Sequence, residues 1–192
     1  FIAYFFLLRY LGPYGTGQQQ FVLSYVTIFG VIIDFGIQQY IIKRMSEDPE
    51  NIKKYFQTFL AVEVVLAVCV YAVAVGIAYV NNYEPVLLYA IMVAGIGMVI
   101  NGLTYPFLSV MSAHHDLRKV ALINFLNSLI NVAIIFATIA FERYIVFLVS
   151  NQLIFGLVAL FLYSRFIRRY IPQPQSFKAF KKLDWKLVKT IF

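Results

Sequence analysis

The sequence predicts an all-α protein, a polytopic bundle of transmembrane helices. Of its 192 residues, 61% are hydrophobic and only 13% are charged, and the mean hydropathy is +0.78. A soluble domain of this length could not cover so much apolar surface. All Lys and Arg residues except Arg9 and Arg143 lie in alternate connections between long apolar segments. This alternation is typical of membrane proteins, whose cytoplasmic loops carry the excess of Lys and Arg.

Six spans are expected, at about residues 1–11, 18–42, 53–80, 84–113, 117–141 and 143–170. The first has about eight apolar residues before Arg9, whereas a complete span needs about twenty. We therefore expect it to be the remnant of a longer helix, and the chain to be incomplete.

Turn-forming residues mark the ends of the spans. Gly12-Pro13 ends the first, and residues 81–85 (Asn-Asn-Tyr-Glu-Pro) separate the third from the fourth. The proline-containing segment 171–175 stops the sixth. Residues 176–189 then alternate phenylalanine and leucine with lysine, which predicts an amphipathic interfacial helix leading into a seventh span.

The fourth span carries helix-bending residues. Pro106 follows Gly95, Gly97 and Gly102, and this combination predicts a kinked or flexible helix. Bent helices at membrane depth are common in transporters, whose rigid halves rock around a central site.

The basic connections give an orientation. The segment 43–54, the connection after Ala113 and the chain beyond Arg165 should face the cytoplasm, which also places the N-terminus inside. The net charge of +7 is then topogenic and attracts anionic lipid headgroups, so it does not indicate nucleic-acid binding. We expect a multi-pass protein of the inner or plasma membrane, with the lipid bilayer as its partner.

No catalytic or metal site is expected. Cys69 is the only cysteine, which excludes a disulfide framework and a cysteine-based metal site. His114-His115-Asp116 suggests metal or acyl-transfer chemistry, but adjacent histidines on a helix point in different directions and the chain has no third one. The connections are too short to hold a soluble catalytic domain, and no Walker A motif is present. We therefore expect no enzyme and no cofactor.

Polar side chains follow regular spacings inside the spans. They form one stripe in the second span and another in the fifth, with further polar residues in the fourth and sixth. These are Gln20, Ser24, Thr27, Asp34 and Gln38; Asn124, Asn127, Ser128 and Asn131; Asn101 and Thr104; and Ser150, Asn151 and Gln152. Single amides commonly hydrogen-bond between membrane helices. Two separate stripes at helical spacing favour a hydrated cavity instead.

Two carboxylates lie at matching depth in consecutive antiparallel spans. Asp34 is nine residues before Lys43 and Glu63 is nine residues after Lys54, so each lies roughly 13 Å inside the basic boundary. Charged groups at that depth are costly and usually mark an ion or substrate path, including a proton-carrying one. The alternatives are a packing hydrogen bond for Asp34 and snorkelling toward the headgroups for Glu63.

Two roles are possible for Arg9. At the outer end of the first span it is favoured as an interfacial anchor. Its guanidinium could also bind a phosphate through two parallel hydrogen bonds.

Two short motifs resemble a known family. Arg9-Tyr10-Leu11-Gly12-Pro13, followed four residues later by Gly17, resembles the R-x-LGP-xxx-G junction of the polysaccharide transporter family. These proteins are the O-antigen and capsule flippases of the MOP superfamily, relatives of the MATE exporters. Asp34-Phe35-Gly36-Ile37 is similar to the family's D-F-G-[LI], and Lys43-Arg44 follows at the end of the span. Thr16 departs from the aromatic residue usually found before the junction glycine.

The resemblance implies a fold and a function. The 192 residues would be the N-terminal six-helix lobe of a MATE-like flippase with twelve or fourteen spans, and the missing C-terminal half of the chain would be its partner. The substrate would be an undecaprenyl-diphosphate-linked oligosaccharide used for surface polysaccharide such as lipopolysaccharide, moved outward by alternating access. The amide stripes would hydrate sugar hydroxyls, and Arg9 or arginines of the other lobe would meet the diphosphate. Asp34 would be a candidate for coupling to a proton or sodium gradient.

Other functions stay open from the residues alone. A cation-coupled multidrug antiporter of the same superfamily would use Asp34 and Glu63 against a cationic solute. A membrane-embedded glycan polymerase or acyltransferase would use His114 or His115. A purely structural subunit would leave the aligned polar faces unexplained. The candidate pathway residues are Arg9, Asp34, Gln38, Glu63, Asn101, Asn124, Asn127 and Asn131.

Overall fold

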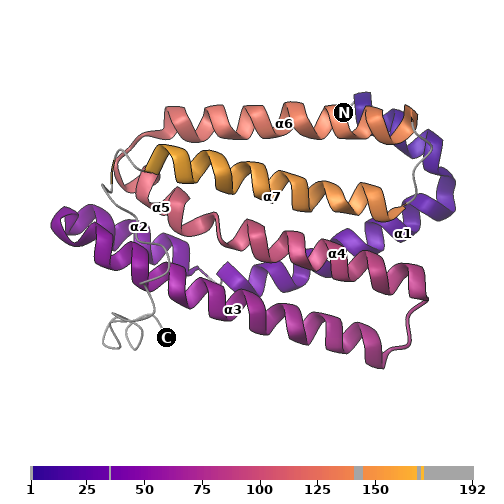
Figure 1. The fold of residues 1–192 in the computed structure, drawn as a ribbon, viewed down its shortest axis with the longest axis horizontal. Coiled ribbons are helices and arrows are strands. Elements are labelled where there is room, and N and C mark those ends of the chain that lie inside the picture. Colours follow the sequence, from indigo (N-terminus) through magenta and orange to yellow (C-terminus); the bar gives the residue numbers. More distant parts are fainter. Residues whose placement is uncertain (1, 35, 141–144, 168–169, 171–192) are drawn as a thin grey trace.

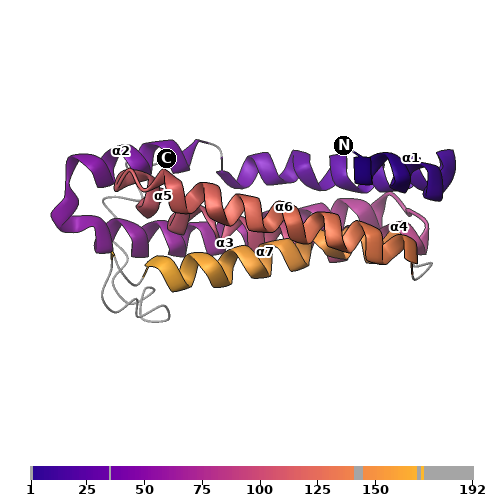
Figure 2. The same ribbon diagram turned by 90° about the horizontal axis from the view of Figure 1, so that it is seen from above.

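The computed structural model describes residues 2–34, 36–140, 145–167 and 170, and over these residues every regular element is helical. The elements are α1 (Ile2–Asp34), α2 (Ile37–Glu47), the short 3₁₀ helix η1 (Pro49–Asn51), α3 (Ile52–Val80), α4 (Pro85–Gly102), α5 (Tyr105–Ala113), α6 (Leu117–Ala140) and α7 (Ile145–Ile167). The long helices run side by side along one axis in an elongated bundle (Figures 1 and 2). The predicted all-α class is confirmed.

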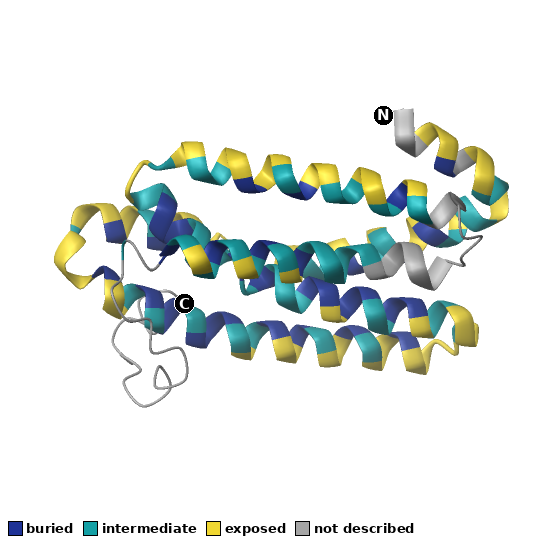
Figure 3. Cartoon of the chain, turned by 45° about the horizontal axis from the view of Figure 1, so that its top comes forward, coloured by how far each residue is buried: buried dark blue, intermediate teal, exposed yellow. Residues whose placement is uncertain are grey.

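Four helical stretches of the described chain are long and apolar enough to cross a membrane. They are Arg9–Glu47, Pro49–Val80, Pro85–Ala113 and Leu117–Ala137, and Asn151–Ile167 is a shorter apolar helix. Exposed residues cover the outward faces of the bundle (Figure 3). On α3 and α6 many of them are large and hydrophobic, as a lipid-facing surface requires. The polytopic transmembrane bundle is therefore confirmed as well.

The helix boundaries differ from the expected spans at two glycines. The loop expected between residues 11 and 18 is instead a kink inside α1 at Gly12, whose φ of 66° and ψ of 179° are not helical. The helix expected to run unbroken over 18–42 ends at Asp34 and resumes as α2 at Ile37, after Gly36 with φ 79°. Hydrophobicity is continuous across both points, so it could not reveal either break.

The fourth span is interrupted as its proline predicted. α4 ends at Gly102 and α5 begins at Tyr105, which puts Pro106 in the first turn of α5, where it removes no helical hydrogen bond. The sixth expected span begins in residues that are not described, and α7 ends at Ile167. The predicted amphipathic helix at 176–189 lies outside the described residues.

Apolar clusters hold the helices together, and two of them meet at α3. One joins α1, α3 and α4 through residues such as Val26, Ala67 and Met98. The other joins α2, α3 and α5 and includes Phe56 and Val110. The breaks after Asp34 and after Gly102 separate α1 and α4 of the first cluster from α2 and α5 of the second, and α3 takes part in both.

Basic connections lie together at one end of the bundle, which we call the basic end. It carries the α2–α3 and α5–α6 connections (Figure 1). Its basic side chains are Lys43, Arg44, Lys53, Lys54, Arg118 and Lys119. The bend within α1 and the α3–α4 turn lie at the opposite end. The spatial grouping agrees with the alternation seen in the sequence.

A polar cluster ties the α5–α6 turn to Tyr170, which follows α7. The Asp116 carboxylate lies 2.6 Å from the Lys119 ammonium, and it also accepts a hydrogen bond from the Tyr170 hydroxyl. Lys119 in turn donates to the Tyr170 hydroxyl over 2.8 Å. The hydrogen bond from Lys119, followed by that from Tyr170, lowers the pKa of Asp116 from 3.8 to about 2.

The pKa shift of Asp116 predicts a pH-dependent contribution to stability. Because the pKa is lowered on folding, the contribution is complete above about pH 4 and disappears as the pH falls toward about 2. Asp116→Asn should therefore loosen the turn above about pH 4 and make no difference near pH 2. Hydrogen exchange of the turn amides, corrected for intrinsic rates, measures this, with Glu84→Gln at the other end as control. An effect of Asp116→Asn that persists undiminished at pH 2 would contradict the assignment.

Candidate functional site

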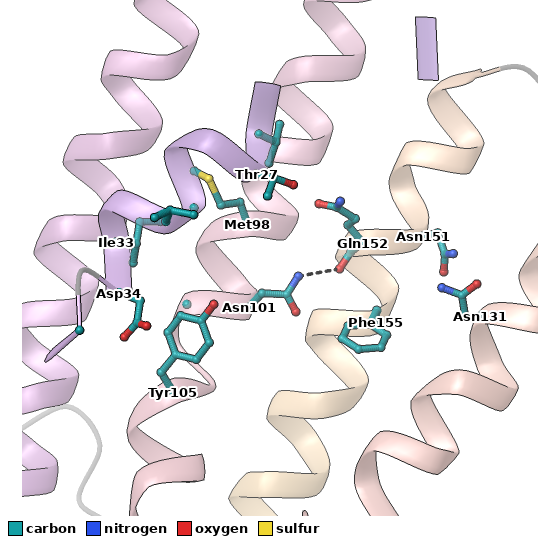
Figure 4. Close-up of a pocket in the computed structure, with 15 residues that line it drawn as sticks. Thr27, Ile33, Asp34, Met98, Asn101, Tyr105, Asn131, Asn151, Gln152 and Phe155 are labelled. Carbon is teal, nitrogen blue, oxygen red and sulfur yellow. Dashed lines mark hydrogen bonds between the residues drawn. The ribbon is translucent and has the colours of Figure 1, made fainter. Parts of the chain in front are cut away.

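A cleft of about 750 Å³ opens between α1, α4, α5, α6 and α7 (Figure 4). Its polar lining comes from side chains on all five helices: Thr27, Asp34, Asn101, Tyr105, Asn131, Asn151 and Gln152. Its apolar lining includes Val31, Met98 and Phe155. Ligand pockets commonly combine an apolar wall with a few polar groups in this way.

The α4–α7 contact fixes one wall of the cleft. The Asn101 side-chain amide donates to the Gln152 carbonyl oxygen over 3.4 Å, shown as the dashed line in Figure 4. The two helices approach closely at Gly97, where an added Cβ would lie 2.9 Å from the Leu153 backbone nitrogen. The absent side chain thus allows Asn101 to reach the backbone of α7.

Asp34 occupies the break between α1 and α2. One of its carboxylate oxygens accepts a hydrogen bond from the Gln38 backbone N–H over 3.3 Å, so the carboxylate caps the N-terminus of α2. Helix N-termini favour negative charge there. In Figure 4 the carboxylate lies on the side of the cleft that carries Tyr105.

Glu63 lies directly behind the cleft wall. Its side chain is fully buried, and neither carboxyl oxygen has a hydrogen-bond partner. An added Cβ on Gly102, which lines the cleft, would lie 3.5 Å from Oε1 of Glu63 and 3.3 Å from a methyl carbon of Ile33.

Amides gather on the opposite side of the cleft. Asn131 of α6 and Asn151 of α7 face each other in Figure 4. Asn127, one helical turn from Asn131, is buried, and the side-chain oxygens of Asn127 and Asn151 have no protein partner. Water or a polar ligand would have to satisfy them.

The structure brings together only some of the predicted pathway residues. Asp34, Asn101 and Asn131 line the cleft, and Glu63 lies behind its wall. Asn127 is buried beside the amide side without being part of the lining. Interhelical placement, rather than spacing along one helix, decides which of these side chains meet.

The other three predicted pathway residues lie apart from the lining. Gln38 is half-buried and reaches the site through its backbone N–H to Asp34. Asn124 is exposed on α6, and Arg9 is exposed on the segment before the Gly12 kink. The spacing of polar residues wrongly placed the Gln38 side chain on the same face as Asp34, because the helix changes direction at the break between α1 and α2.

Two aromatic lining residues were not predicted. Tyr105 and Phe155 belong to no polar stripe, and Phe155 is one phenylalanine among nineteen. The only signal in the sequence was the position of Tyr105 directly before Pro106.

Asp34 is the one charged residue in the described lining. A carboxylate, amides and a hydroxyl suit sugar hydroxyls or a cationic group, but they offer no counter-charge to a phosphate. The lining therefore does not support a diphosphate contact inside this cleft.

A family comparison decides the identity of the chain. The family model described as polysaccharide biosynthesis protein matches residues 1–192. The chain belongs to this family. The match agrees with the polysaccharide transporters of the MOP superfamily that the two motifs resemble. No curated protein and no solved structure matches the chain.

The structure gives the motifs of this polysaccharide biosynthesis protein a physical role. Gly12 of the first motif and Gly36 of the second are the two described glycines with positive φ, and each stands at a change of helix direction. L-residues with a side chain rarely adopt such backbone angles. The chain is thus a membrane protein of the polysaccharide biosynthesis family whose motif glycines shape α1 and α2.

Proposed function

We propose that this protein moves a lipid-linked oligosaccharide, carried on undecaprenyl diphosphate, across the inner or plasma membrane by alternating access. It acts as a transporter and catalyses no covalent step. The observation that carries the proposal is the polar cleft of about 750 Å³ inside a bundle of apolar helices. Polar groups at membrane depth usually mark a substrate path.

The cleft chemistry fits the glycan part of such a substrate. The amides of Asn101, Asn131 and Gln152 can donate to and accept from sugar hydroxyls. The rings of Tyr105 and Phe155 offer apolar faces on which a pyranose can lie. We place the diphosphate outside this lining, at cations elsewhere such as Arg9 or at a second six-helix lobe that would close the cleft.

The basic end faces the cytoplasm in this proposal. Lysines and arginines of both connections at that end would hold it there by the positive-inside rule. The sugar would then enter from the basic end and leave at the end that carries the bend within α1.

Asn131 and Asn124 allow a matched test on one helix. Asn131 lines the cleft, whereas Asn124 is exposed on the same helix, α6. In the full-length protein, Asn131→Ala should lower surface glycan display about fivefold, since one hydrogen bond to the substrate contributes roughly 1 kcal/mol. Lipid-linked oligosaccharide should accumulate on the cytoplasmic leaflet, while Asn124→Ala should display glycan normally at equal protein level.

Two outcomes would count against the proposal. Normal display by Asn131→Ala and Asp34→Asn together would mean that the polar groups only join helices. Intact glycan in a strain without the gene, combined with sensitivity to cationic drugs, would favour the antiporter. The position of Asp34 in the cleft is the observation that favours the antiporter as a second candidate function.

A further inference from the structure

The charge of the cleft lining limits which sugars the cleft can hold. Within the described part of the chain, the lining contains Asp34 but no lysine or arginine. The Asp34 carboxylate accepts a hydrogen bond from the Gln38 backbone N–H at the start of α2, where negative charge is favoured. The described lining therefore carries a negative charge that no lining cation balances.

Donor groups of the lining are partly engaged within the protein. The Thr27 hydroxyl donates to the Leu23 carbonyl oxygen over 2.7 Å, and the Asn101 side-chain amide donates to the Gln152 carbonyl oxygen over 3.4 Å. The side-chain oxygens of Thr27 and Asn101 still accept hydrogen bonds. Asn151 adds a buried carbonyl oxygen without a partner in the protein. These positions therefore offer mainly acceptors, which pair with hydroxyl or N–H donors of a ligand.

Sugars differ in what they present to such a lining. A neutral hexose or an acetamido sugar presents hydroxyl and N–H donors, whereas the ionised carboxylate of a uronic acid only accepts. In the cleft, that carboxylate would meet the charge of Asp34 and the unpartnered oxygen of Asn151. The apolar walls, which include Met98 and Phe155, exclude water and so strengthen the repulsion between like charges. An acidic sugar is therefore strongly disfavoured in this cleft.

We propose that the cleft accepts uncharged sugars, which carry hydroxyl or acetamido groups, and rejects sugars that carry a carboxylate. This inference rests on the proposed function and names the class of glycan that the protein moves. Asp34 sets the selectivity through its charge, and Asn151 contributes through its unpartnered oxygen. The diphosphate of the carrier lies outside this lining in the proposed function, so the same selection does not act on it.

Two lipid-linked disaccharides that differ in one group test this selectivity. Both are carried on undecaprenyl diphosphate, and the terminal sugar is glucose in one and glucuronic acid in the other. Full-length protein in proteoliposomes should move the glucose form at least about tenfold faster, measured by the access of external periodate to the glycan. Asp34→Asn should reduce this ratio severalfold, because asparagine removes the charge and still accepts a backbone N–H at a helix N-terminus. Glu50→Gln removes a carboxylate at an exposed position in η1 and should leave the ratio unchanged.

The ratio of the two rates separates this inference from the proposed function. Equal rates for the two forms, or a faster glucuronate form, would overturn the selectivity and leave transport standing. Movement of neither form would contradict the proposed function as well. Asn131→Lys is the second variant, because it places a cation in the lining and should also lower the ratio. If the wild-type ratio persists in both Asp34→Asn and Asn131→Lys, the charge of this lining does not select the sugar.

Discussion

Replacing Gly97 by alanine is expected to destabilise the protein by about 1–3 kcal/mol, the cost of overpacking a tightly packed site. The new Cβ would lie 2.9 Å from the Leu153 nitrogen and 3.0 Å from the Gln152 carbonyl carbon. These are backbone atoms, so no flexible side chain can move aside. α4 and α7 would have to separate, and the hydrogen bond from Asn101 to Gln152 would lengthen beyond its 3.4 Å.

Gly76→Ala is the matched control for Gly97→Ala. Gly76 also lies within a long helix, but an added Cβ there meets no atom within 4 Å. Alanine should be neutral or slightly stabilising at that position, because it is the better helix former. Thermal unfolding of the purified variants in one detergent measures both effects. Equal midpoints for the two variants would show that α4 and α7 are not packed through Gly97.

Much of the fold could be predicted because the bilayer constrains it. The length of the apolar segments predicted the helices. The alternation of Lys and Arg predicted that the basic connections share one end, where Lys43, Lys54 and Arg118 lie. Pro106 gave the α4–α5 break. The break at Gly36 was missed because a glycine inside an apolar run is compatible with a continuous helix until its backbone angles are known.

The candidate site was less predictable, since a cleft depends on how helices are rotated against one another. Spacing of three and four residues correctly placed Asn127 and Asn131 on inward-facing positions of α6 but also included the exposed Asn124. Depth counted from the basic boundary placed Asp34 and Glu63 near one another, and the structure shows a wall of Gly102 between Glu63 and the cleft. Tyr105 and Phe155 carried no polar signal in the sequence.

Replacing Gly12 by alanine is expected to destabilise the packing of residues 2–11 against the rest of the bundle by about 1–3 kcal/mol. The backbone of Gly12, with φ 66° and ψ 179°, lies in a region that is essentially restricted to glycine. Space is not the obstacle, because an added Cβ would meet no atom within 4 Å. The penalty comes from the backbone alone. Leu7, 1% exposed, is the side chain that docking of this segment buries.

Gly17→Ala separates strain at the kink from a general effect of the added methyl group. Gly17 also has open space around an added Cβ, but its backbone is helical, so alanine should be tolerated or favoured there. Hydrogen exchange of residues 2–11 should rise in Gly12→Ala and stay unchanged in Gly17→Ala, while exchange in α3 and α4 should be the same in both. If residues 2–11 stay protected from hydrogen exchange in Gly12→Ala, then α1 can change direction without a positive φ at this position. The glycine of the Leu11-Gly12-Pro13 junction would then have to be explained by something other than backbone conformation.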